Sequence, residues 1–385
     1  MDLKLNRSTD AIVMGGGLIG CSIALRLAQA GRSVAIFERS EPGCEASSAG
    51  AGMIAPQGET TEPDDFYYLC AASRDLYAAF AAEVEELSGE SVFFCREGTL
   101  FAALDDKQEE ELDRIFTAQS KAGLPVTRLS AADALRRAPQ LNRDVRGALD
   151  MPGDYRVDNE RLAFALAQAC RRTGVVFHSH TTVTRLTSRN GRVEAIEAHN
   201  ESGPASYSAG TFVLAAGAWS AELASTLGIS IPMTPCRGQL IEFTGAEDFC
   251  VTLRAGHCYL VPRSAGRLVV GSIMEYVGFE KAVTGGGLNA IIEAAVRLAP
   301  RTRGLIFRRA WSGFRPDTAD HLPVLGRSQL PNLVIATGHF RNGILLTPIT
   351  AKLISELILH GSPSIPLDAY SPLRFDRRKG AGSTG

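Results

Sequence analysis

The hydrophobic positions of residues 10–38 predict a strand, a helix and a second strand. The segment DAIVM is a short apolar run, LIGCSIALRLAQA has its apolar residues at helical spacing, and SVAIFE is again typical of a strand. Gly31 stands where such a helix would end. A strand, a helix and a strand in this order form the unit that opens a parallel sheet.

The next part of the chain interrupts this alternation with β-rich segments. Helical patterns cover residues 64–88 and 106–122, and Ser130 with Asp133 forms a capping pair for a further short helix. Stretches between them, such as FFCREGTLFAAL, are typical of short strands. We therefore expect a second domain to be inserted into the first.

Residues 158–219 are expected to return to the first sheet. An amphipathic helix that follows Asp158 precedes the strand VVFHSH. The segments TTVTRL and RVEAIEA flank Asn190-Gly191, a strong signal for a two-residue hairpin turn. FVLAAGAWS then predicts a buried strand followed by a turn and a helix.

The last third of the chain contains both kinds of pattern. Residues 236–283 are rich in short strands, residues 287–299 predict a helix, and residues 305–314 predict another strand. The strand LVIAT, the turn GHFRNG and a long helix over residues 344–360 complete the first sheet.

The expected fold class is α/β, with a Rossmann-like domain into which a β-rich α+β domain is inserted. The first domain is assigned to residues 1–62, 150–228 and 312–376, and the second to residues 63–149 and 229–311. Residues 377–385 are expected to form a disordered tail.

Composition excludes several functional classes. The formal net charge of -2 leaves no basic field for nucleic acid. The N-terminus lacks the pattern of an export signal, and no apolar run is long enough for a transmembrane segment. The eight cysteines form no C-x-x-C pair, so we expect reduced thiols, a cytoplasmic location and no metal site. His178 and His180 share a strand face without further ligands and are interpreted as structural.

A G-x-G-x-x-G motif lies between the first strand and the first helix. Gly15 permits the tight turn, Gly17 lets the backbone approach a pyrophosphate, and Gly20 lets the helix pack closely on the strand. The N–H groups of Leu18 and Ile19 are then expected to face the phosphates. The motif predicts a dinucleotide site.

Two residues at the end of the second strand extend this site. The carboxylate of Glu38 is placed to accept hydrogen bonds from the ribose hydroxyls of an adenosine, and Arg39 is placed to lie along the adenine. Neither feature distinguishes NAD from FAD, so a nicotinamide dehydrogenase remains possible at this point.

The segment over residues 46–53 consists of small residues that fit along a long cofactor. Its candidate contacts are Ser47, Ser48, Ala51, Gly52 and Met53. Since NAD enzymes rarely need such a segment here, FAD is favoured. At this point the chain resembles the amino-acid-oxidising flavoenzymes, which include D-amino acid oxidase, sarcosine oxidase and glycine oxidase.

Three later blocks strengthen the resemblance. They are HCYLVPRSAGRLVVGSIM (257–274), WSGFRPDT (311–318) and GHFRNGILLTP (338–348), and together they are similar to the glycine oxidases of thiamine biosynthesis. The resemblance implies a D-amino acid oxidase-like fold in which the first domain binds FAD and the second binds substrate. Because no cysteine lies near the turn at 338–343, noncovalent FAD is expected.

The resemblance also implies roles for individual residues. Arg315 would hold the substrate carboxylate, Tyr259 would support it with its hydroxyl, and Arg341 is a second candidate for the carboxylate or for the flavin carbonyl side. His257, Met53 and Met274 are expected in the pocket wall. Further expected cofactor contacts are Val183, Gly217, Trp219, His339, Phe340, Arg341, Asn342, Gly343 and Ile344.

The resemblance implies an activity. Hydride would pass from the α-carbon of glycine, sarcosine or a small D-amino acid to flavin N5, and the resulting imine would hydrolyse to an oxo acid and ammonia or an amine. Oxygen would become hydrogen peroxide, the glycine imine could feed thiazole synthesis, and a homotetramer is implied. Two alternatives remain: a D-amino acid dehydrogenase that passes electrons to a quinone or protein acceptor, and a non-enzymatic binder of flavin or nucleotide.

Overall fold

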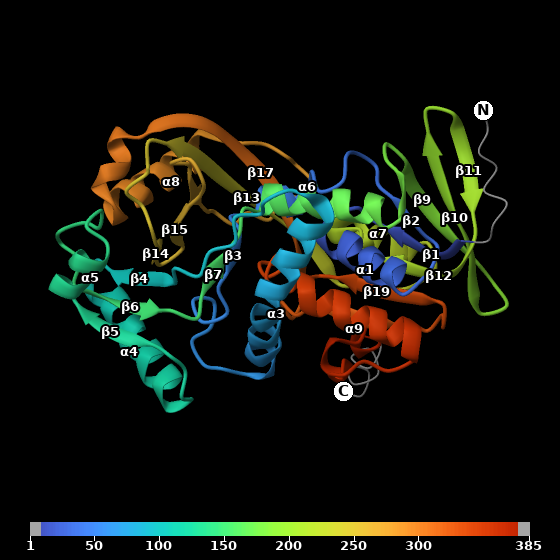
Figure 1. Cartoon of the computed structure of the whole chain (residues 1–385), viewed down its shortest axis with the longest axis horizontal. Coiled ribbons are helices and arrows are strands. Elements are labelled where there is room, and N and C mark those ends of the chain that lie inside the picture. Colours follow the sequence, from blue (N-terminus) through green and yellow to red (C-terminus); the bar gives the residue numbers. More distant parts are fainter. Residues whose placement is uncertain (1–8, 376–385) are drawn as a thin grey trace, which may run out of the picture.

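The computed structural model describes residues 9–375, and one part of it is built on a six-stranded sheet (Figure 1). All neighbours in this sheet are parallel except β18 and β19. The predicted opening unit is confirmed, because β1 and β2 are neighbours in the sheet. The expected tail at 377–385 lies outside the described residues. The strand order is β18 (Val324–Arg327), β19 (Leu333–Thr337), β12 (Ala209–Leu214), β1 (Thr9–Met14), β2 (Val34–Phe37) and β8 (Val176–His178).

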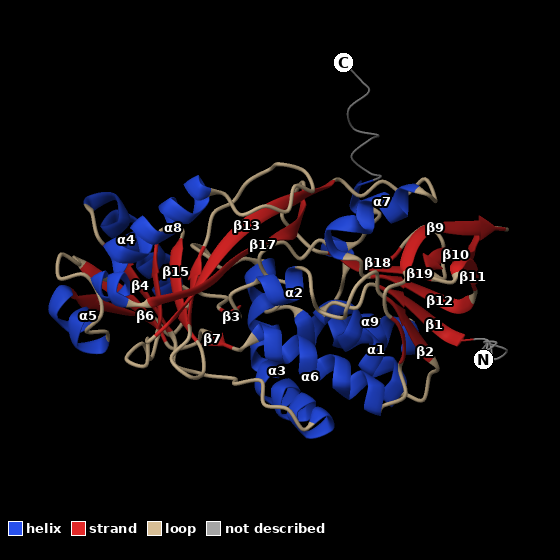
Figure 2. Cartoon of the chain, turned by 90° about the horizontal axis from the view of Figure 1, so that it is seen from above, coloured by secondary structure: helices blue, strands red, loops and turns tan. Residues whose placement is uncertain are grey.

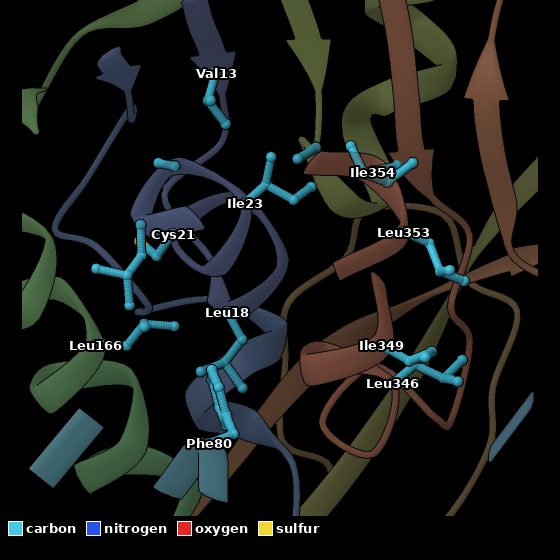
Figure 3. Packing of buried hydrophobic residues seen from close by; sticks show 14 of the residues in the cluster. Val13, Leu18, Cys21, Ile23, Phe80, Leu166, Leu346, Ile349, Leu353 and Ile354 are labelled. Atoms are coloured by element: carbon cyan, nitrogen blue, oxygen red, sulfur yellow. The ribbon is translucent and has the colours of Figure 1, made fainter. Parts of the chain in front are cut away.

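Four helices lie on one side of this sheet and share a core with it. Figure 3 shows Ile23 of the first helix facing its neighbours, with Leu166 on one side and Leu353 on the other. Their apolar faces explain why the predicted helices pack here. Within residues 9–375, no helix combines the length and apolar character needed to cross a bilayer. The four helices are α1 (Leu18–Gln29), α3 (Asp65–Ser88), α6 (Asn159–Arg172) and α9 (Thr347–His360).

The opposite face is covered by a three-stranded antiparallel sheet, β9 (Thr182–Arg189), β10 (Arg192–Asn200) and β11 (Gly203–Tyr207), and by α7 (Ser220–Ser225). The predicted hairpin is confirmed, with positive φ at both Asn190 (53°) and Gly191 (72°). The parallel sheet is therefore buried on both faces, as its continuous apolar strands require.

The other part of the molecule is a mixed eight-stranded sheet. Helices α5 (Ala131–Arg137) and α8 (Gly285–Leu298) pack in one of its cores, and α4 (Asp106–Lys121) packs in another. Figure 2 shows the long pair β13 and β17 running from this sheet toward the parallel sheet. The strand order is β17 (Ile306–Thr318), β13 (Met233–Thr244), β16 (Leu268–Gly271), β15 (Cys258–Pro262), β14 (Thr252–Ala255), β4 (Thr99–Ala103), β6 (Gly147–Met151) and β5 (Thr127–Ser130).

Two short strands join these parts of the molecule. β3 (Met53–Ile54) pairs with β7 (Tyr155–Arg156) where the chain passes from one sheet to the other and back. Positions 150 and 312, at which the two expected domains meet, fall inside β6 and β17.

Two predicted boundaries were wrong. The helix expected from Ile344 begins at Thr347, because residues 343–346 form a turn and Pro348 occupies the first helical turn, where its missing N–H is tolerated. The strand expected to end at residue 314 continues to Thr318. Its pairing with β13 extends to that residue, so backbone hydrogen bonds decide the boundary.

Candidate active site

A cavity of about 930 Å³ opens where the carboxyl ends of the parallel strands face the eight-stranded sheet. Its wall includes residues from β1, from the start of α1, from the segment after β2, and from β15 and β17. Ligands bind at such strand ends in open α/β sheets because the loops there converge. The cavity is large enough for an extended cofactor and a small substrate together.

The glycine motif shapes one end of this cavity. Gly15 has φ +108°, and a Cβ there would overlap the carbonyl of Ala215. Gly20 lies outside the cavity wall, and a Cβ on it would overlap the carbonyl of Gly15, so it permits close packing of helix on strand. The N–H of Leu18 donates to Oγ of Ser47 (2.9 Å), whereas it was expected to face phosphate directly.

Glu38 is held rigidly at the end of β2. Its Oε2 accepts a hydrogen bond from the N–H of Gly16 (2.8 Å), and its Oε1 accepts one from the N–H of Ser40 (3.0 Å). Oε1 also accepts a longer hydrogen bond from the hydroxyl of Ser40 (3.3 Å), whereas Oε2 retains capacity to accept one more. The predicted ribose acceptor is thus presented in a fixed orientation.

Arg39 stacks on an aromatic side chain at the same end of the cavity. Its guanidinium carbon lies 3.5 Å from the centre of the Trp219 ring, and it pairs with Glu45 at 2.7 Å. The ring of Phe279 also stacks on the indole of Trp219, with 5.2 Å between the ring centroids. Arg39 and Trp219 are thus stacked on each other in the cavity wall, and flat groups of this kind can contact an adenine ring or its neighbouring groups.

The small-residue segment runs along the cavity through the short helix α2 (Ala46–Ala49). Asn159 donates to the carbonyl oxygens of Ser47 (2.7 Å) and Ser48 (3.0 Å) and so fixes its path. The hydroxyl of Ser48 donates back to the carbonyl of Glu45, and Ser48 does not line the cavity. Gly52 has φ +81°, and a Cβ there would overlap the carbonyl of Val157.

Arg315 presents a positive charge to the cavity. From β17, its Nη2 donates to Oγ of Ser272 (2.8 Å) and its Nη1 to the carbonyl of Ile273 (3.3 Å). The guanidinium lies directly against Gly238, where any side chain would overlap it. Among the described residues Arg315 forms no ion pair, so its charge is available to an anionic ligand.

Tyr259 lies on β15 and is 7% exposed. It packs across Gly271 of β16, since a Cβ on that glycine would lie 2.8 Å from the Tyr259 hydroxyl. Within residues 9–375 this hydroxyl makes no hydrogen bond, and the residue lines the same cavity as Arg315. Within residues 9–375, a phenol without a hydrogen-bond partner and a guanidinium without an ion pair therefore line one cavity.

Arg341 is already neutralised. Its Nη2 lies 2.7 Å from Oε2 of Glu59, and Oε1 of Glu59 lies 3.1 Å from Nη1 of Arg254. Glu59 lines the cavity as well, although sequence reasoning did not select it. No motif surrounds it, and its partners are distant in sequence.

The turn that follows β19 supplies the remaining expected contacts. His339 is buried, and burial lowers its pKa from 6.5 to about 3, so that it is neutral at physiological pH. Its Nε2 lies 3.1 Å from Oγ1 of Thr350. Phe340 adopts φ 45° and lines the cavity, whereas Asn342 does not.

The structure brings nearly all of the predicted site residues to one cavity. Gly20, Ser48 and Asn342 are the expected residues that do not line it. The wall residues that sequence reasoning missed include Glu59, Gly238 and Ser272. The expected residues that line the cavity, besides those described above, are Gly17, Ile19, Ala51, Met53, Val183, Gly217, His257, Met274, Gly343 and Ile344.

These residues fit a flavin dinucleotide. Gly15 and Gly52 contribute only backbone to the cavity wall, because a Cβ on either would overlap a neighbouring carbonyl. The fixed acceptor Glu38 lies at one end of the cavity and cationic Arg315 lines it elsewhere. Within residues 9–375 no group of three or more metal-ligating side chains is present.

Comparison with known proteins gives consistent matches. The family model DAO, described as FAD dependent oxidoreductase, matches residues 10–357. Glycine oxidase from Geobacillus kaustophilus (strain HTA426) is 32% identical over 370 residues, covering 95% of this chain and 97% of that protein. The crystal structure of glycine oxidase from Geobacillus kaustophilus superposes with a TM-score of 0.90, covering 95% of this chain and 98% of that one.

Two further relatives differ in extent and name. The bifunctional protein ThiO/ThiG of Trichormus variabilis (strain ATCC 29413 / PCC 7937) is 34% identical over 374 residues, which are 96% of this chain but 55% of that protein. The structure of iminodiacetate oxidase from Chelativorans sp. BNC1 is 29% identical with a TM-score of 0.84, covering 94% of this chain and 98% of that chain.

Proposed function

This chain belongs to the DAO family of FAD-dependent oxidoreductases, and we propose that it oxidises glycine or another small amino acid, with oxygen as electron acceptor. It is an FAD-dependent amino acid oxidoreductase. The observation that carries the proposal is the unpaired guanidinium of Arg315 in the same cavity wall as the dinucleotide cradle.

The residues that would hold FAD are those of the glycine motif, the α2 segment and Glu38. The N-terminus of α1 would face the pyrophosphate, where helix N–H groups and the helix dipole favour negative charge. Glu38 would accept hydrogen bonds from ribose hydroxyls, because two backbone N–H groups fix its orientation. Nothing in the first turn of α1 is acidic, so this turn itself places no like charge against the phosphates.

The substrate would be positioned by side chains from two strands. The Arg315 guanidinium would bind the carboxylate through two parallel hydrogen bonds, and the Tyr259 hydroxyl would donate a further one. Two fixed contacts on the carboxylate restrict the orientation of the α-carbon, which lowers the entropic cost of reaction. FAD held in this cavity would supply the two-electron acceptor for the hydride of that carbon, and oxygen would take up the electrons to give hydrogen peroxide.

The size of the amino acid would be limited by the pocket wall. Met53, Leu240 and His257 line the cavity together with Tyr259. Apolar walls exclude water from the reacting carbon and strengthen the polar contacts to the carboxylate. The candidate substrates to be tested are therefore four small amino acids: glycine, sarcosine, D-alanine and D-proline.

Oxygen consumption tests the proposed function. FAD-loaded protein is mixed with each member of the panel in air, and oxygen uptake and hydrogen peroxide are recorded. The proposal predicts equimolar oxygen uptake and peroxide with at least one substrate. Flavin reduction by substrate without oxygen uptake, but with reduction of an added quinone, would instead establish the D-amino acid dehydrogenase.

Compartment and assembly are part of the same proposal. All eight cysteines are free in the structure, which supports a reducing compartment such as the cytoplasm. A homotetramer and delivery of the glycine imine to thiazole synthesis are proposed from the similarity to glycine oxidase and ThiO/ThiG. Size-exclusion chromatography with light scattering measures the assembly.

A further inference from the structure

Two arginines that line the cavity differ in their electrostatic state. Arg315 has no acidic partner among the described residues, whereas Arg341 pairs with Glu59 at 2.7 Å. The two arginines lie on adjacent chain segments, because the N–H of Phe340 donates to the carbonyl of Pro316 (3.1 Å). Arg315 is therefore open to an anionic ligand, whereas the carboxylate of Glu59 already occupies Arg341 on the neighbouring segment.

The carboxylate of Glu59 is held between two cations. Its side chain is 16% exposed, and its second oxygen lies 3.1 Å from Nη1 of Arg254. Arg254 also donates to the carbonyl of Gly58 and stacks over the ring of Phe101 at 4.7 Å. If the Glu59 carboxylate moved away from Arg341, its contact with Arg254 would therefore be disturbed as well.

The backbone on both sides of Glu59 is fastened by buried polar groups. The carboxylate of Asp154 accepts hydrogen bonds from the N–H groups of Gln57 (3.0 Å) and Gly58 (3.1 Å). Gln119 donates to the carbonyls of Gln57 (3.0 Å) and Thr60 (2.8 Å). Glu59 is thus a fixed acid in the cavity wall, in contrast to a surface glutamate free to swing away.

We propose that Glu59 sets the charge class of the substrate: it occupies the guanidinium of Arg341 and so excludes compounds that carry a second carboxylate. This inference rests on the proposed function only in taking Arg315 as the site of the first carboxylate. A second carboxylate near Arg341 would meet the like charge of Glu59, and displacing Glu59 would leave a largely buried carboxylate with one partner fewer. Compounds with one carboxylate avoid both costs.

A matched pair of amines tests the wild-type protein. Sarcosine carries a methyl group where iminodiacetate carries a carboxymethyl group, so the second carboxylate is the main difference. We expect kcat/KM for iminodiacetate to be lower by about 100-fold, the effect of a close like charge in a partly buried site. Equal kcat/KM for the two amines would overturn the proposal.

Binding of simple carboxylates gives a readout that does not depend on turnover. Kd values for acetate and malonate are measured by calorimetry on the FAD-loaded protein. In Glu59→Gln, Arg341 becomes available, so malonate should bind at least about tenfold more tightly while acetate changes less than about twofold. The double variant Glu59→Gln with Arg341→Gln should lose the gain for malonate.

Glu222 supplies the control, because it also lines the cavity but forms no ion pair within residues 9–375. Glu222→Gln should leave the ratio of malonate to acetate affinity unchanged. An equal gain in Glu222→Gln, or retention of the gain in the double variant, would show a general charge effect and overturn the assignment to Glu59. If Glu59→Gln behaves as expected but no amino acid is oxidised, the proposed function fails and the charge selection stands.

Discussion

At the scale of single residues, Arg315 is the side chain on which substrate binding depends. Its guanidinium is fixed by Ser272 and by the carbonyl of Ile273, neither of which carries charge. Gly238 leaves the space in which it lies. A fixed cation without an anionic partner is costly to maintain in a partly enclosed cavity, and a substrate carboxylate removes that cost.

Arg315→Ala is therefore expected to raise KM for the amino acid by about 100-fold or more, since a bidentate charged contact is lost. FAD should remain bound, because the cofactor cradle is built from other segments. Steady-state kinetics and the visible flavin spectrum measure the two effects. As a control, Arg308→Ala, in the exposed part of the same strand, should change KM less than about twofold. An unchanged KM in Arg315→Ala would remove Arg315 from the substrate site.

His339 predicts a pH dependence of stability. Burial lowers its pKa from 6.5 to about 3, so between these values the unfolded chain binds more protons than the folded one. The contribution of neutral His339 to the free energy of unfolding is present above pH 6.5. It declines as the pH falls from about 6.5 toward 3, by at most about 1.4 kcal/mol per pH unit.

Denaturant unfolding at pH 7 and pH 5 measures this effect. In His339→Gln, the loss of stability between the two pH values should be smaller by about 2 kcal/mol than in the wild type. Equal losses would mean that burial does not lower the pKa of His339 in the folded protein. The hydrogen bond to Thr350 makes glutamine a suitable replacement, since its amide group can also donate and accept.

Sequence reasoning selected Arg315 and Tyr259 because both lie in blocks that resemble a family. It missed Glu59, because the partners of Glu59, Arg254 and Arg341, lie 195 or more positions away and no local pattern links them. For the same reason it could not foresee that Arg341 is neutralised. Long-range ion pairs are set by tertiary structure, which residue spacing along the chain does not encode.

At the scale of elements, the crossing from one sheet to the other depends on Gly52. This residue precedes β3, has φ +81°, and its Cα faces the carbonyl of Val157 without room for a Cβ. Its carbonyl accepts a hydrogen bond from the N–H of Val157 (2.8 Å). The close approach keeps the small-residue segment next to the cavity.

Gly31 makes a matched comparison, since its φ of +77° is similar but nothing lies within 4 Å of the position that a Cβ would take. Both Gly52→Ala and Gly31→Ala should suffer the strain of a left-handed residue with a Cβ. The free energy of unfolding should fall by about 1 to 3 kcal/mol more in Gly52→Ala than in Gly31→Ala, because the backbone at Val157 must also move. Chemical unfolding measures both variants, and equal losses would show that the contact with Val157 is unimportant.

Elements with local signals were predicted well. The opening βαβ unit, the hairpin at Asn190-Gly191 and the helix capped by Asp158 all follow from short patterns. The parallel pairing of β14 with β4 could not be predicted, because it joins segments 153 residues apart at Thr99 and Thr252. Such pairings are chosen by the packing of the whole sheet.

At the scale of the whole molecule, the chain passes repeatedly between two sheets and leaves a cavity where they meet. The parallel sheet contributes the glycine cradle and Glu38, while the eight-stranded sheet contributes Tyr259 and Arg315. Neither part of the molecule alone contains both sets of residues. The site therefore requires segments that are far apart in the sequence. From the sequence alone, these segments could be recognised only because α/β patterns and β-rich patterns alternate along the chain.

The most direct test of this account is anaerobic flavin reduction. Purified protein is loaded with FAD, oxygen is removed, and glycine, sarcosine, D-alanine and D-proline are added in turn while the visible flavin absorbance is followed. The account predicts that at least one of these amino acids bleaches the absorbance and that admission of oxygen restores it. A protein that binds FAD yet is reduced by none of them would contradict the account.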